Sequence, residues 1–420
     1  MLHRAKSLNK DAVIVATGCY VQTEKDRTKL NEVADILVGN NHKGEIARTV
    51  ISYLENKYSQ KINDIFASEP ERKSETENSY KENLIDDISA ESCVESLNIK
   101  EYPERSRAFV RIEDGCNQFC TYCIIPYARG RVRSRSEGDI IKEVKELAVY
   151  GFKEVVLTGI HISSYGFDNY EKMLKKNEND STSINYDTAL FDYAPLMKLI
   201  KRISEVEGIE RIRLSSLEPR IITREFAEQL KAISAFCPHF HLSLQSGCDS
   251  VLKRMNRHYK SDEFLDRCRI LREVFDRPAI TTDVIVGFPG ETEEEFELSL
   301  DMCKNACFAK MHIFKYSRRK GTVADKMPGQ LTESKKHERS VMMQAADEEM
   351  QDCYISSFIG DVVKVLVEEK VDGFYQGLTE RYVQVRFNEK ETDLINKIVS
   401  VKITGKAAKG ILFGELQNNT

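Results

Sequence analysis

Strand and helix patterns alternate along residues 106–330, and this alternation constrains the fold more than any other feature of the chain. Short apolar runs typical of buried strands cover 108–114, 153–160, 211–218, 239–246, 280–287 and 310–317. Helical patterns separate them at 137–150, 193–207, 223–235, 261–275 and 292–306. Because strands that alternate with helices form parallel sheets, the pattern predicts an α/β fold with an open, partial (β/α)6 barrel. The polar residues 167–190 interrupt the second unit as a surface insertion.

Three stretches flank the predicted barrel, which spans 106–345. In residues 1–58, AVIVATG and ADILVG predict two buried parallel strands with a helix near 22–32 between them. This small α/β unit is similar to the second half of a domain. Residues 59–105 are polar without sustained periodicity, which predicts a linker. Residues 357–420 alternate with period two between glycine-containing turns, which predicts a small antiparallel β-barrel.

Charge and composition exclude several classes of protein. With 62 Lys and Arg against 67 Asp and Glu, the net charge is −5, so nucleic acid would have to be bound through local basic patches. No apolar run reaches the about 18 residues that a membrane helix needs. The N-terminal segment MLHRAKSLNKDAVIVATG lacks the apolar core of a secretory signal. These features predict a cytoplasmic protein that does not contact a membrane.

The segment EDGCNQFCTYC gathers Cys116, Cys120 and Cys123 in one loop after the first predicted barrel strand. The chain has 11 cysteines, an odd number that favours thiols or metal ligands over a disulfide framework. Clustered thiolates bind iron–sulfur clusters or zinc. A structural zinc site needs a fourth ligand, which would have to be remote, such as a distant histidine or Cys19. A four-iron cluster held by three cysteines instead leaves one iron open to a substrate or cofactor.

The ends of the other predicted barrel strands carry glycine together with polar or charged residues. They read TGIHISSYG, SSLEP, QSGCD, GFPGE and YSRRKGT. In parallel barrels the chemistry collects in loops at the carboxyl ends of the strands. This bias therefore predicts one shared active face beside the cysteine loop.

The spacing C-x3-C-x-Tyr-C, formed by Cys116, Cys120, Tyr122 and Cys123, resembles the radical-SAM motif. The wider string GCNQFCTYCIIPYARGRVRSR resembles the methylthiotransferase family, as do HLSLQSGCDSVLKRMNRHY, DVIVGFPGETEEEF and FKYSRRKGTVA. GIHISSYG and SSLEP are most similar to the branch that modifies N6-threonylcarbamoyladenosine in tRNA. The β-rich tail resembles that family's TRAM module. The resemblance covers most of the chain apart from the linker and the insertion.

This resemblance implies the chemistry of a tRNA methylthiotransferase. The three loop cysteines would hold a [4Fe–4S] cluster whose open iron chelates S-adenosyl-L-methionine. One electron from a flavodoxin- or ferredoxin-type donor would cleave the sulfonium to a 5′-deoxyadenosyl radical. The methylthio group would be added at C2 of the modified adenosine that lies 3′ of the anticodon. Because that C–H bond is not acidic, the resemblance implies a radical borne by the cofactor and no catalytic acid–base residue.

Six residues at the strand ends and in the loop are expected to contact S-adenosylmethionine, although ordinary turn chemistry would also account for them. They are Tyr122, Gly159, Glu218, Gln245, Gly287 and Gly290. The tyrosine would pack against the adenine, and the first glycine would admit the methionine end. The glutamate and glutamine would hydrogen-bond polar groups of the cofactor, and the last two glycines would leave room beside the adenine.

Two basic groups are candidates for contact with the tRNA anticodon stem-loop. The first is the arginine run after the cysteine loop, Arg129, Arg131, Arg133 and Arg135. Its nearness to the loop favours phosphate contacts over the simpler alternative of a solvated face. The second comprises Lys364 and Lys402, which lie among aromatic residues of the predicted C-terminal barrel. Small barrels that interleave basic and aromatic residues commonly bind RNA.

One departure from the family concerns a second, auxiliary [4Fe–4S] cluster, which family members hold with three cysteines of the N-terminal domain. Cys19, in VATGCYVQ, is the one match in this sequence. The first unit is therefore expected to be a truncated flavodoxin-like domain whose upstream residues would carry the other two ligands. The alternatives are a methylthiotransferase of the isopentenyladenosine branch or for a ribosomal-protein aspartate, a truncated non-catalytic tRNA-binding protein, and a zinc-stabilised barrel acting on a small molecule.

Overall fold

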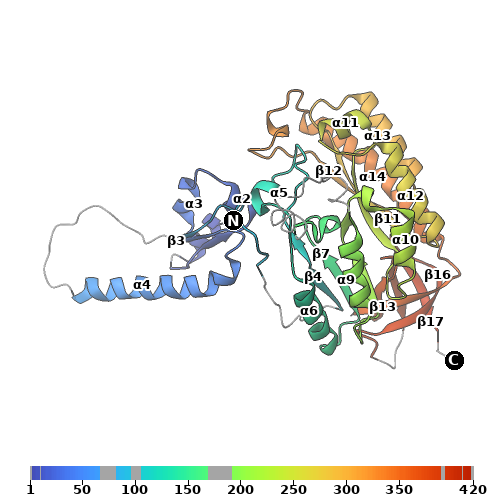
Figure 1. Ribbon diagram of the computed structural model, residues 1–420, viewed down its shortest axis with the longest axis horizontal. Coiled ribbons are helices and arrows are strands. Elements are labelled where there is room, and N and C mark those ends of the chain that lie inside the picture. Colours follow the sequence, from blue (N-terminus) through green and yellow to red (C-terminus); the bar gives the residue numbers. More distant parts are fainter. Residues whose placement is uncertain are drawn as a thin grey trace, which may run out of the picture. The chain divides into compact units, whose positions relative to one another are not determined.

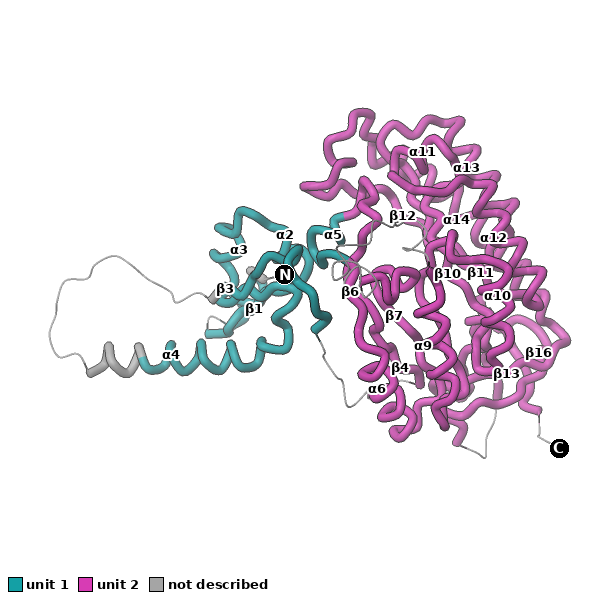
Figure 2. Tube along the Cα trace, in the orientation of Figure 1, with its two compact units in different colours: residues 1–98, 124–131 teal, residues 99–123, 132–420 magenta. Residues whose placement is uncertain are grey.

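The computed structural model describes residues 2–9, 11–66, 82–95, 106–168, 192–388, 393–408 and 410–417 of the 420-residue chain (Figure 1). The chain divides into two compact units, residues 1–98 with 124–131 and residues 99–123 with 132–420 (Figure 2). Most of the predicted insertion, and the predicted linker over 67–81 and 96–105, lie outside the described residues.

The first unit is a small parallel sheet with helices. Its strands β1 (Val15–Thr17), β2 (Ile36–Val38) and β3 (Glu82–Leu84) pair in the order β1-β2-β3. Its helices are α1 (Leu2–Leu8), α2 (Cys19–Thr23), α3 (Thr28–Val33), α4 (Ile46–Phe66) and α5 (Ile125–Arg129). The two predicted strands are confirmed. The linker prediction is corrected at both α4, which continues to residue 66, and β3, which adds a third strand.

All six predicted barrel strands are present in the second unit. They are β4 (Arg107–Arg111), β7 (Glu154–Thr158), β8 (Arg211–Leu214) with β9 (Ser216–Leu217), β10 (His239–Gln245), β11 (Ala279–Val286) and β12 (Lys310–Lys315). The third predicted strand is interrupted at Ser215, so the parallel strands form two sheets, β4-β7-β8 and β9-β10-β11-β12. This arrangement confirms the predicted α/β alternation.

Five helices lie along the outside of these strands, at the positions that the helical patterns predict (Figure 1). They are α6 (Glu137–Val149), α9 (Ala194–Ser204), α10 (Arg224–Lys231), α12 (Ser261–Val274) and α13 (Glu293–Ala306). In α9 the buried residues Leu196, Leu199, Ile200 and Ile203 recur every three or four positions, which places one apolar face against the sheet. The core of the second unit therefore lies between the strands and these helix faces.

A closed five-stranded barrel follows the long helix α14 (Glu333–Ser356). Its strands are β13 (Val362–Val371), β14 (Phe374–Thr379), β15 (Gln384–Asn388), β16 (Ile398–Ala408) and β17 (Ile411–Leu416). They pair in the order β13-β14-β15-β17-β16, and β15 runs parallel to β17. The predicted small barrel is confirmed, but it is not purely antiparallel. β16 lies between β13 and β17 and is antiparallel to both, and β17 closes the barrel by pairing with β15 in the same direction.

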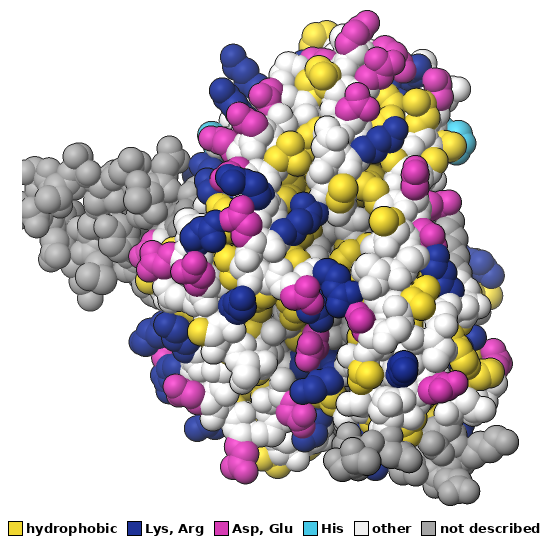
Figure 3. All heavy atoms as spheres, turned by 90° about the vertical axis from the view of Figure 1, so that its right-hand side faces the viewer, with side chains coloured by type: hydrophobic (Ala, Val, Ile, Leu, Met, Phe, Trp, Pro, Cys, Tyr) yellow, Lys and Arg dark blue, Asp and Glu magenta, His cyan; other side chains and the backbone are white. Residues whose placement is uncertain are grey.

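Charged side chains of both signs are interspersed on the face that Figure 3 shows, in keeping with a net charge of −5. Lys and Arg lie next to Asp and Glu over much of this face, with apolar side chains between them (Figure 3). Among the described residues, no helix is both long enough and apolar enough to pass through a lipid bilayer.

Candidate active site

The cysteine loop begins directly after the short strand β5 (Glu113–Asp114). Cys116 is buried, and Cys120 and Cys123 are half-buried. The Gln118 N–H donates to Cys116 Sγ at 3.5 Å, and the Cys123 N–H donates to Cys120 O at 2.9 Å, which closes a turn. Burial raises the pKa of the Cys116 thiol, and the two neighbouring thiols raise it further. The three sulfurs are thus close enough to interact electrostatically.

A segment distant in sequence holds this loop. It is the turn after helix α11 (Asp249–Arg254). The Thr121 N–H donates to Met255 O at 3.0 Å, and Thr121 Oγ1 donates to Arg254 O at 2.9 Å. Asn256 Nδ2 donates to Gln118 O at 3.3 Å and to the next carbonyl of the loop at 3.2 Å. These four hydrogen bonds fix the backbone from which the cysteines project.

Arg257 links the loop to the predicted cofactor residue Glu218. Its Nη1 donates to Cys120 Sγ at 3.4 Å, and its Nη2 donates to Glu218 Oε2 at 2.7 Å. Burial by itself would raise the pKa of Glu218, but the guanidinium lowers it to about 2, so the carboxylate is ionised. Sequence reasoning missed Arg257, although it lies in the family-like string MNRHY.

Gly159 is explained by a buried carboxyl group. It follows β7, and a Cβ atom at this position would lie 2.6 Å from Glu113 Oε2. The same oxygen accepts from the His161 N–H at 2.7 Å. Burial raises the pKa of Glu113 to about 8. The close packing of the glutamate thus requires glycine here, while the predicted approach of the methionine end of S-adenosylmethionine stays a prediction.

Tyr122 and the glycines after β11 lie around a second apolar cluster. The Tyr122 and Phe288 rings meet edge-on with centroids 6.4 Å apart, and both belong to a cluster with Cys248 and Tyr316. Gly287 and Gly290 flank this phenylalanine with φ angles of 73° each, a left-handed conformation that favours glycine. Their predicted contact with the adenine of the cofactor stays a prediction.

Gln245 ends β10 with a φ of 69°, which is uncommon for a residue with a side chain. Backbone strain of this kind concentrates at functional sites. The Arg257 guanidinium donates to Ser243 O at 3.2 Å, two residues before Gln245. Glu218 and Gln245 therefore occupy neighbouring strand ends beside the arginine that reaches Cys120.

Two of the predicted phosphate-binding arginines form ion pairs, Arg133 buried and Arg135 half-buried. Arg133, on β6 (Arg133–Ser134), is 2% exposed, and its Nη2 lies 3.8 Å from Asp114 Oδ2 on the paired strand β5. Arg135 Nη1 lies 2.7 Å from Glu143 Oε2 on α6. The burial of Arg133 corrects its predicted phosphate contact, whereas the contact of the half-buried Arg135 stays a prediction.

The other predicted basic residues are placed differently. Arg129 and Arg131 lie in the first unit, and the side chain of Arg131 is exposed. Lys364 on β13 and Lys402 on β16 are both exposed. β13 and β16 pair with Lys402 opposite Val362, and Lys364 lies two residues further along β13. The two lysines are therefore diagonal neighbours on the outside of the C-terminal barrel.

A cavity of about 670 Å³ lies inside the second unit, lined by strand residues such as Ser216, His241 and Asp283. Its other wall belongs to the C-terminal barrel, where the Tyr382 ring lies 4.7 Å from the Arg213 guanidinium. This volume lies within the range of about 300–1,000 Å³ that is usual for small-molecule pockets. His239 and Ala279, the first residues of β10 and β11, also line this cavity, so it lies toward the beginnings of the strands and not at the carboxyl ends that carry the candidate site.

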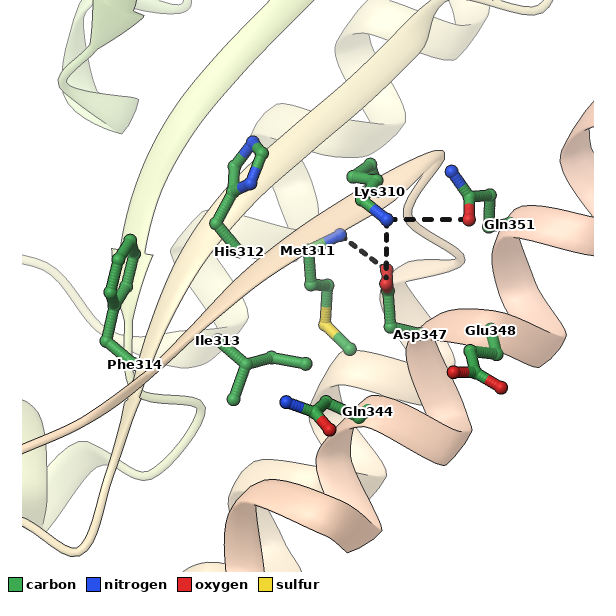
Figure 4. A pocket seen from close by; sticks show the side chains of 9 residues that line it. All are labelled: Lys310, Met311, His312, Ile313, Phe314, Gln344, Asp347, Glu348 and Gln351. Atoms are coloured by element: carbon green, nitrogen blue, oxygen red, sulfur yellow. Dashed lines mark hydrogen bonds and ion pairs between the residues drawn. The ribbon is translucent and has the colours of Figure 1, made fainter. Parts of the chain in front are cut away.

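A smaller pocket of about 360 Å³ lies between the edge strand β12 and helix α14 (Figure 4). Asp347 on α14 accepts from the Met311 N–H at 2.6 Å and from Lys310 Nζ at 3.4 Å. Gln351 accepts from the same Nζ at 3.4 Å. The helix thereby supplies partners for polar groups of the sheet edge, which would otherwise invite pairing with another chain.

The donor set of the cysteine loop fits an iron–sulfur cluster. Three soft thiols project from one clamped loop, and three cysteines leave one iron of a [4Fe–4S] cluster available to another ligand. Among the described residues, no three His, Cys, Asp or Glu side chains are placed to hold a single metal ion. Cys116, Cys120 and Cys123 would hold the cluster, which with S-adenosylmethionine supplies one-electron cleavage of a carbon–sulfur bond.

Comparison with known proteins places this site in a class. Residues 110–303 match the Radical SAM superfamily, so the alternating fold and its cysteine loop define a radical-SAM enzyme that uses a [4Fe–4S] cluster and S-adenosylmethionine. Threonylcarbamoyladenosine tRNA methylthiotransferase MtaB of Bacillus subtilis is 35% identical over 96% of this chain and 81% of that protein. The corresponding protein of Aquifex aeolicus is 35% identical over 96% of this chain and 86% of its own length. The chain belongs to the radical-SAM tRNA methylthiotransferase family, with the MtaB-type enzymes.

Two further likenesses are less decisive. The tRNA-2-methylthio-N(6)-dimethylallyladenosine synthase of Clostridium tetani is 35% identical over 95% of this chain and 79% of that protein. The solved structure of the cobalamin-dependent S-adenosylmethionine radical enzyme OxsB is 14% identical with a TM-score of 0.45, covering 84% of this chain and 45% of that one. That structural likeness is too low to bear on function.

Proposed function

We propose that this chain adds a methylthio group to C2 of N6-threonylcarbamoyladenosine, 3′ of the anticodon in tRNA, by radical-SAM chemistry. The observation that carries the proposal is the clamped cysteine loop with its Arg257–Glu218 pair, in a chain that matches MtaB over 96% of its length. The protein's own residues hold the cofactors and shield them from water, and the cofactors supply the bond cleavage.

A second candidate substrate is the dimethylallyladenosine of the other branch, because the Clostridium tetani synthase matches nearly the whole chain as well. The two substrates differ at N6, where one carries a charged carboxylate and the other an apolar chain. The strand-end strings GIHISSYG and SSLEP favour the threonylcarbamoyl substrate.

The C-terminal barrel is proposed to be a TRAM-like RNA-binding module. Its closed five-stranded form and the exposed pair Lys364 and Lys402 support a role in holding the anticodon stem-loop. The first unit is proposed to be part of a flavodoxin-like domain. Its order β1-β2-β3 is that of the last three strands of a flavodoxin-like sheet. We further propose a cytoplasmic location and a flavodoxin- or ferredoxin-type electron donor, as tRNA modification by a low-potential cluster requires.

Cys19 is proposed as one ligand of a second [4Fe–4S] cluster. It is half-buried at the start of α2, directly after β1, and Asn40 Nδ2 lies 3.7 Å from its sulfur. Residues 1–98 contain one further cysteine, Cys93, which is exposed. The iron content of the reconstituted protein distinguishes one cluster, at about four iron atoms per chain, from two, at about eight.

The proposal is tested with the anaerobically reconstituted chain, S-adenosylmethionine as the source of the methyl group and of the radical, inorganic sulfide as the source of sulfur, dithionite, and two tRNAs that carry either threonylcarbamoyladenosine or dimethylallyladenosine. Mass spectrometry of the digested nucleosides is expected to show a methylthio adduct of the first alone, and Cys120→Ala is expected to abolish it. Formation of 5′-deoxyadenosine without any methylthio product would reduce the proposal to a radical generator. An adduct of the second nucleoside would move the chain to the other branch.

A further inference from the structure

The Arg257 side chain is buried next to the cysteine loop. Its side chain is 6% exposed, and each of its three nitrogens donates to a defined acceptor. Nη1 donates to Cys120 Sγ at 3.4 Å, Nη2 to Glu218 Oε2 at 2.7 Å and Ser243 O at 3.2 Å, and Nε to the Tyr259 hydroxyl at 3.2 Å. The planar guanidinium is therefore fixed, with one N–H edge aimed at a sulfur of the cysteine loop.

The charge of Arg257 is not fully cancelled by its partner. Glu218 Oε1 also accepts from Arg220 Nε at 3.3 Å, so two guanidiniums share one carboxylate. The Glu218 side chain is 2% exposed, which places the pair in surroundings of low dielectric constant. A residual positive charge thus lies in hydrogen-bond contact with Cys120.

We propose that Arg257 raises the reduction potential of the cluster at the cysteine loop through its hydrogen bond to Cys120, an inference that rests on the proposed function. Hydrogen bonds to cluster sulfurs and nearby positive charge favour the reduced form, because that form carries one more negative charge. The electron comes from an external low-potential one-electron donor, which is itself oxidised. No bond forms or breaks at Arg257, and its guanidinium keeps its proton.

A positioning role of this kind is separable from a purely structural one. If the arginine only ties the 254–257 turn to the loop, its loss lowers cluster retention but leaves the potential of the retained cluster unchanged. If the charge of Arg257 acts on the cluster, removal of the arginine lowers the reduction potential even of those clusters that are retained. The reduction potential is therefore the readout, measured without tRNA or S-adenosylmethionine.

The experiment is a dithionite titration of the full chain, anaerobically reconstituted and followed by electron paramagnetic resonance. The decisive pair is Glu218→Gln against the double variant Glu218→Gln with Arg257→Met, because the double variant leaves no unpaired buried carboxylate. Arg257→Lys keeps the charge and loses the planar fork. Arg272→Met is the control for the loss of an arginine, since that exposed guanidinium donates to the carbonyl of Cys307, directly after α13, at 3.0 Å.

The double variant is expected to show a reduced-to-oxidised ratio about tenfold lower than Glu218→Gln at the same potential, about 59 mV for a one-electron couple. The reduction potential of Arg257→Lys is expected to lie between those of the wild type and the double variant. The reduction potential of Arg272→Met is expected to equal that of the wild type. Equal ratios in the decisive pair, with iron content maintained, would overturn the inference and leave the proposed function standing. A wild-type chain that binds no iron would overturn both.

Discussion

The two regions that carry conspicuous cysteines are built differently. In the second unit, three thiols project from a loop whose backbone is fastened by four hydrogen bonds to the turn after α11. In the first unit, Cys19 stands alone at the start of a helix of five residues. Asn40 Nδ2 lies 3.7 Å from its sulfur and also donates to Ala128 O at 2.6 Å. The first region gathers three thiols in one loop, and the second presents the single thiol of Cys19 beside a side-chain amide.

This difference shows where the geometry of a metal site originates. The cysteine spacing brings three thiols near one another, but it does not fix their directions. The fixing contacts come from Thr121, Asn256 and Arg257, and the last two lie more than a hundred residues along the chain. A ligand set thus depends on packing that the motif itself does not contain.

The largest expected effect separates the two regions by iron content. Cys120→Ala removes one of the three thiols of the cysteine loop and is expected to lose the about four iron atoms that this loop would hold. Cys19→Ala leaves the cysteine loop untouched and is expected to retain those four. Iron and acid-labile sulfide are measured after anaerobic reconstitution. Retention of a full complement by Cys120→Ala would show that the loop is not the ligand set.

A second prediction tests the remote fastening. Asn256 has a φ of 60°, so Asn256→Gly keeps the backbone relaxed while removing both side-chain hydrogen bonds to the loop. The loss of two partly buried hydrogen bonds is expected to cost about 1–3 kcal/mol. Iron release to a chelator should become faster by roughly tenfold or more. Asn256→Ala should release iron faster still, because alanine is strained at positive φ.

The matched control for this prediction is Asn40→Ala in the first unit. Asn40 is 3% exposed, so its loss leaves Ala128 O without that donor and should lower the thermal stability of this unit. Release of the iron held by the cysteine loop should stay at the wild-type rate. Equal acceleration by the two asparagine variants would mean that iron retention reports general stability and not the clamp.

Sequence periodicity predicts the strands of the second unit better than those of the first unit. The strands of the partial barrel lie in short apolar runs between helical patterns, and each lies within a few residues of its predicted position. β3 reads ENL and carries one apolar residue, so no periodic signal marks it within a polar stretch. The parallel closure of β15 on β17 depends on the path of the whole barrel, which local alternation does not encode.

Site prediction follows the same division. The three loop cysteines are visible because their spacing itself carries the chemistry. Arg257 and Glu113 acquire their roles from distant partners, Cys120 and His161, so single-sequence patterns do not reveal them. Arg133 appears in a basic run typical of a phosphate contact, yet its partner Asp114 buries it. Charge patterns show that a residue is cationic and not which way it faces.

A third prediction sharpens the account of what lies behind the cysteine loop. In Gly159→Ala the new Cβ would lie 2.6 Å from Glu113 Oε2 and 3.0 Å from Glu113 O, so the β5 backbone or the loop must move. Overpacking of this kind is expected to lower the free energy of unfolding by about 1–3 kcal/mol. Urea denaturation measures it.

Gly138→Ala is the control for the glycine variant. Gly138 lies in the first turn of α6, and its nearest neighbour to a new Cβ is 4.0 Å away. Because alanine is the better helix former, this variant is expected to gain up to about 1 kcal/mol. Equal free energies of unfolding for Gly159→Ala and Gly138→Ala would show that the Glu113 side chain moves away from the new Cβ without destabilising the fold.

The smallest expected effect concerns binding without chemistry. Lys364→Gln with Lys402→Gln removes two exposed charges from the C-terminal barrel and should weaken tRNA binding several-fold at low salt. The slope of log affinity against log salt should become shallower by about 1–2, because each lysine that neutralises a phosphate contributes about 0.7–0.9. Filter binding measures both quantities, and iron content should be unchanged.

The exposed lysines Lys142 and Lys145 of α6 provide the matched control for this pair, since their replacement by glutamine removes the same charge from the second unit. If both double variants reduce the salt slope equally, tRNA responds to the overall charge of the protein. If the barrel pair alone reduces it, the contact is local. In that case the C-terminal barrel contributes binding energy that is lost without any change in the iron held by the protein.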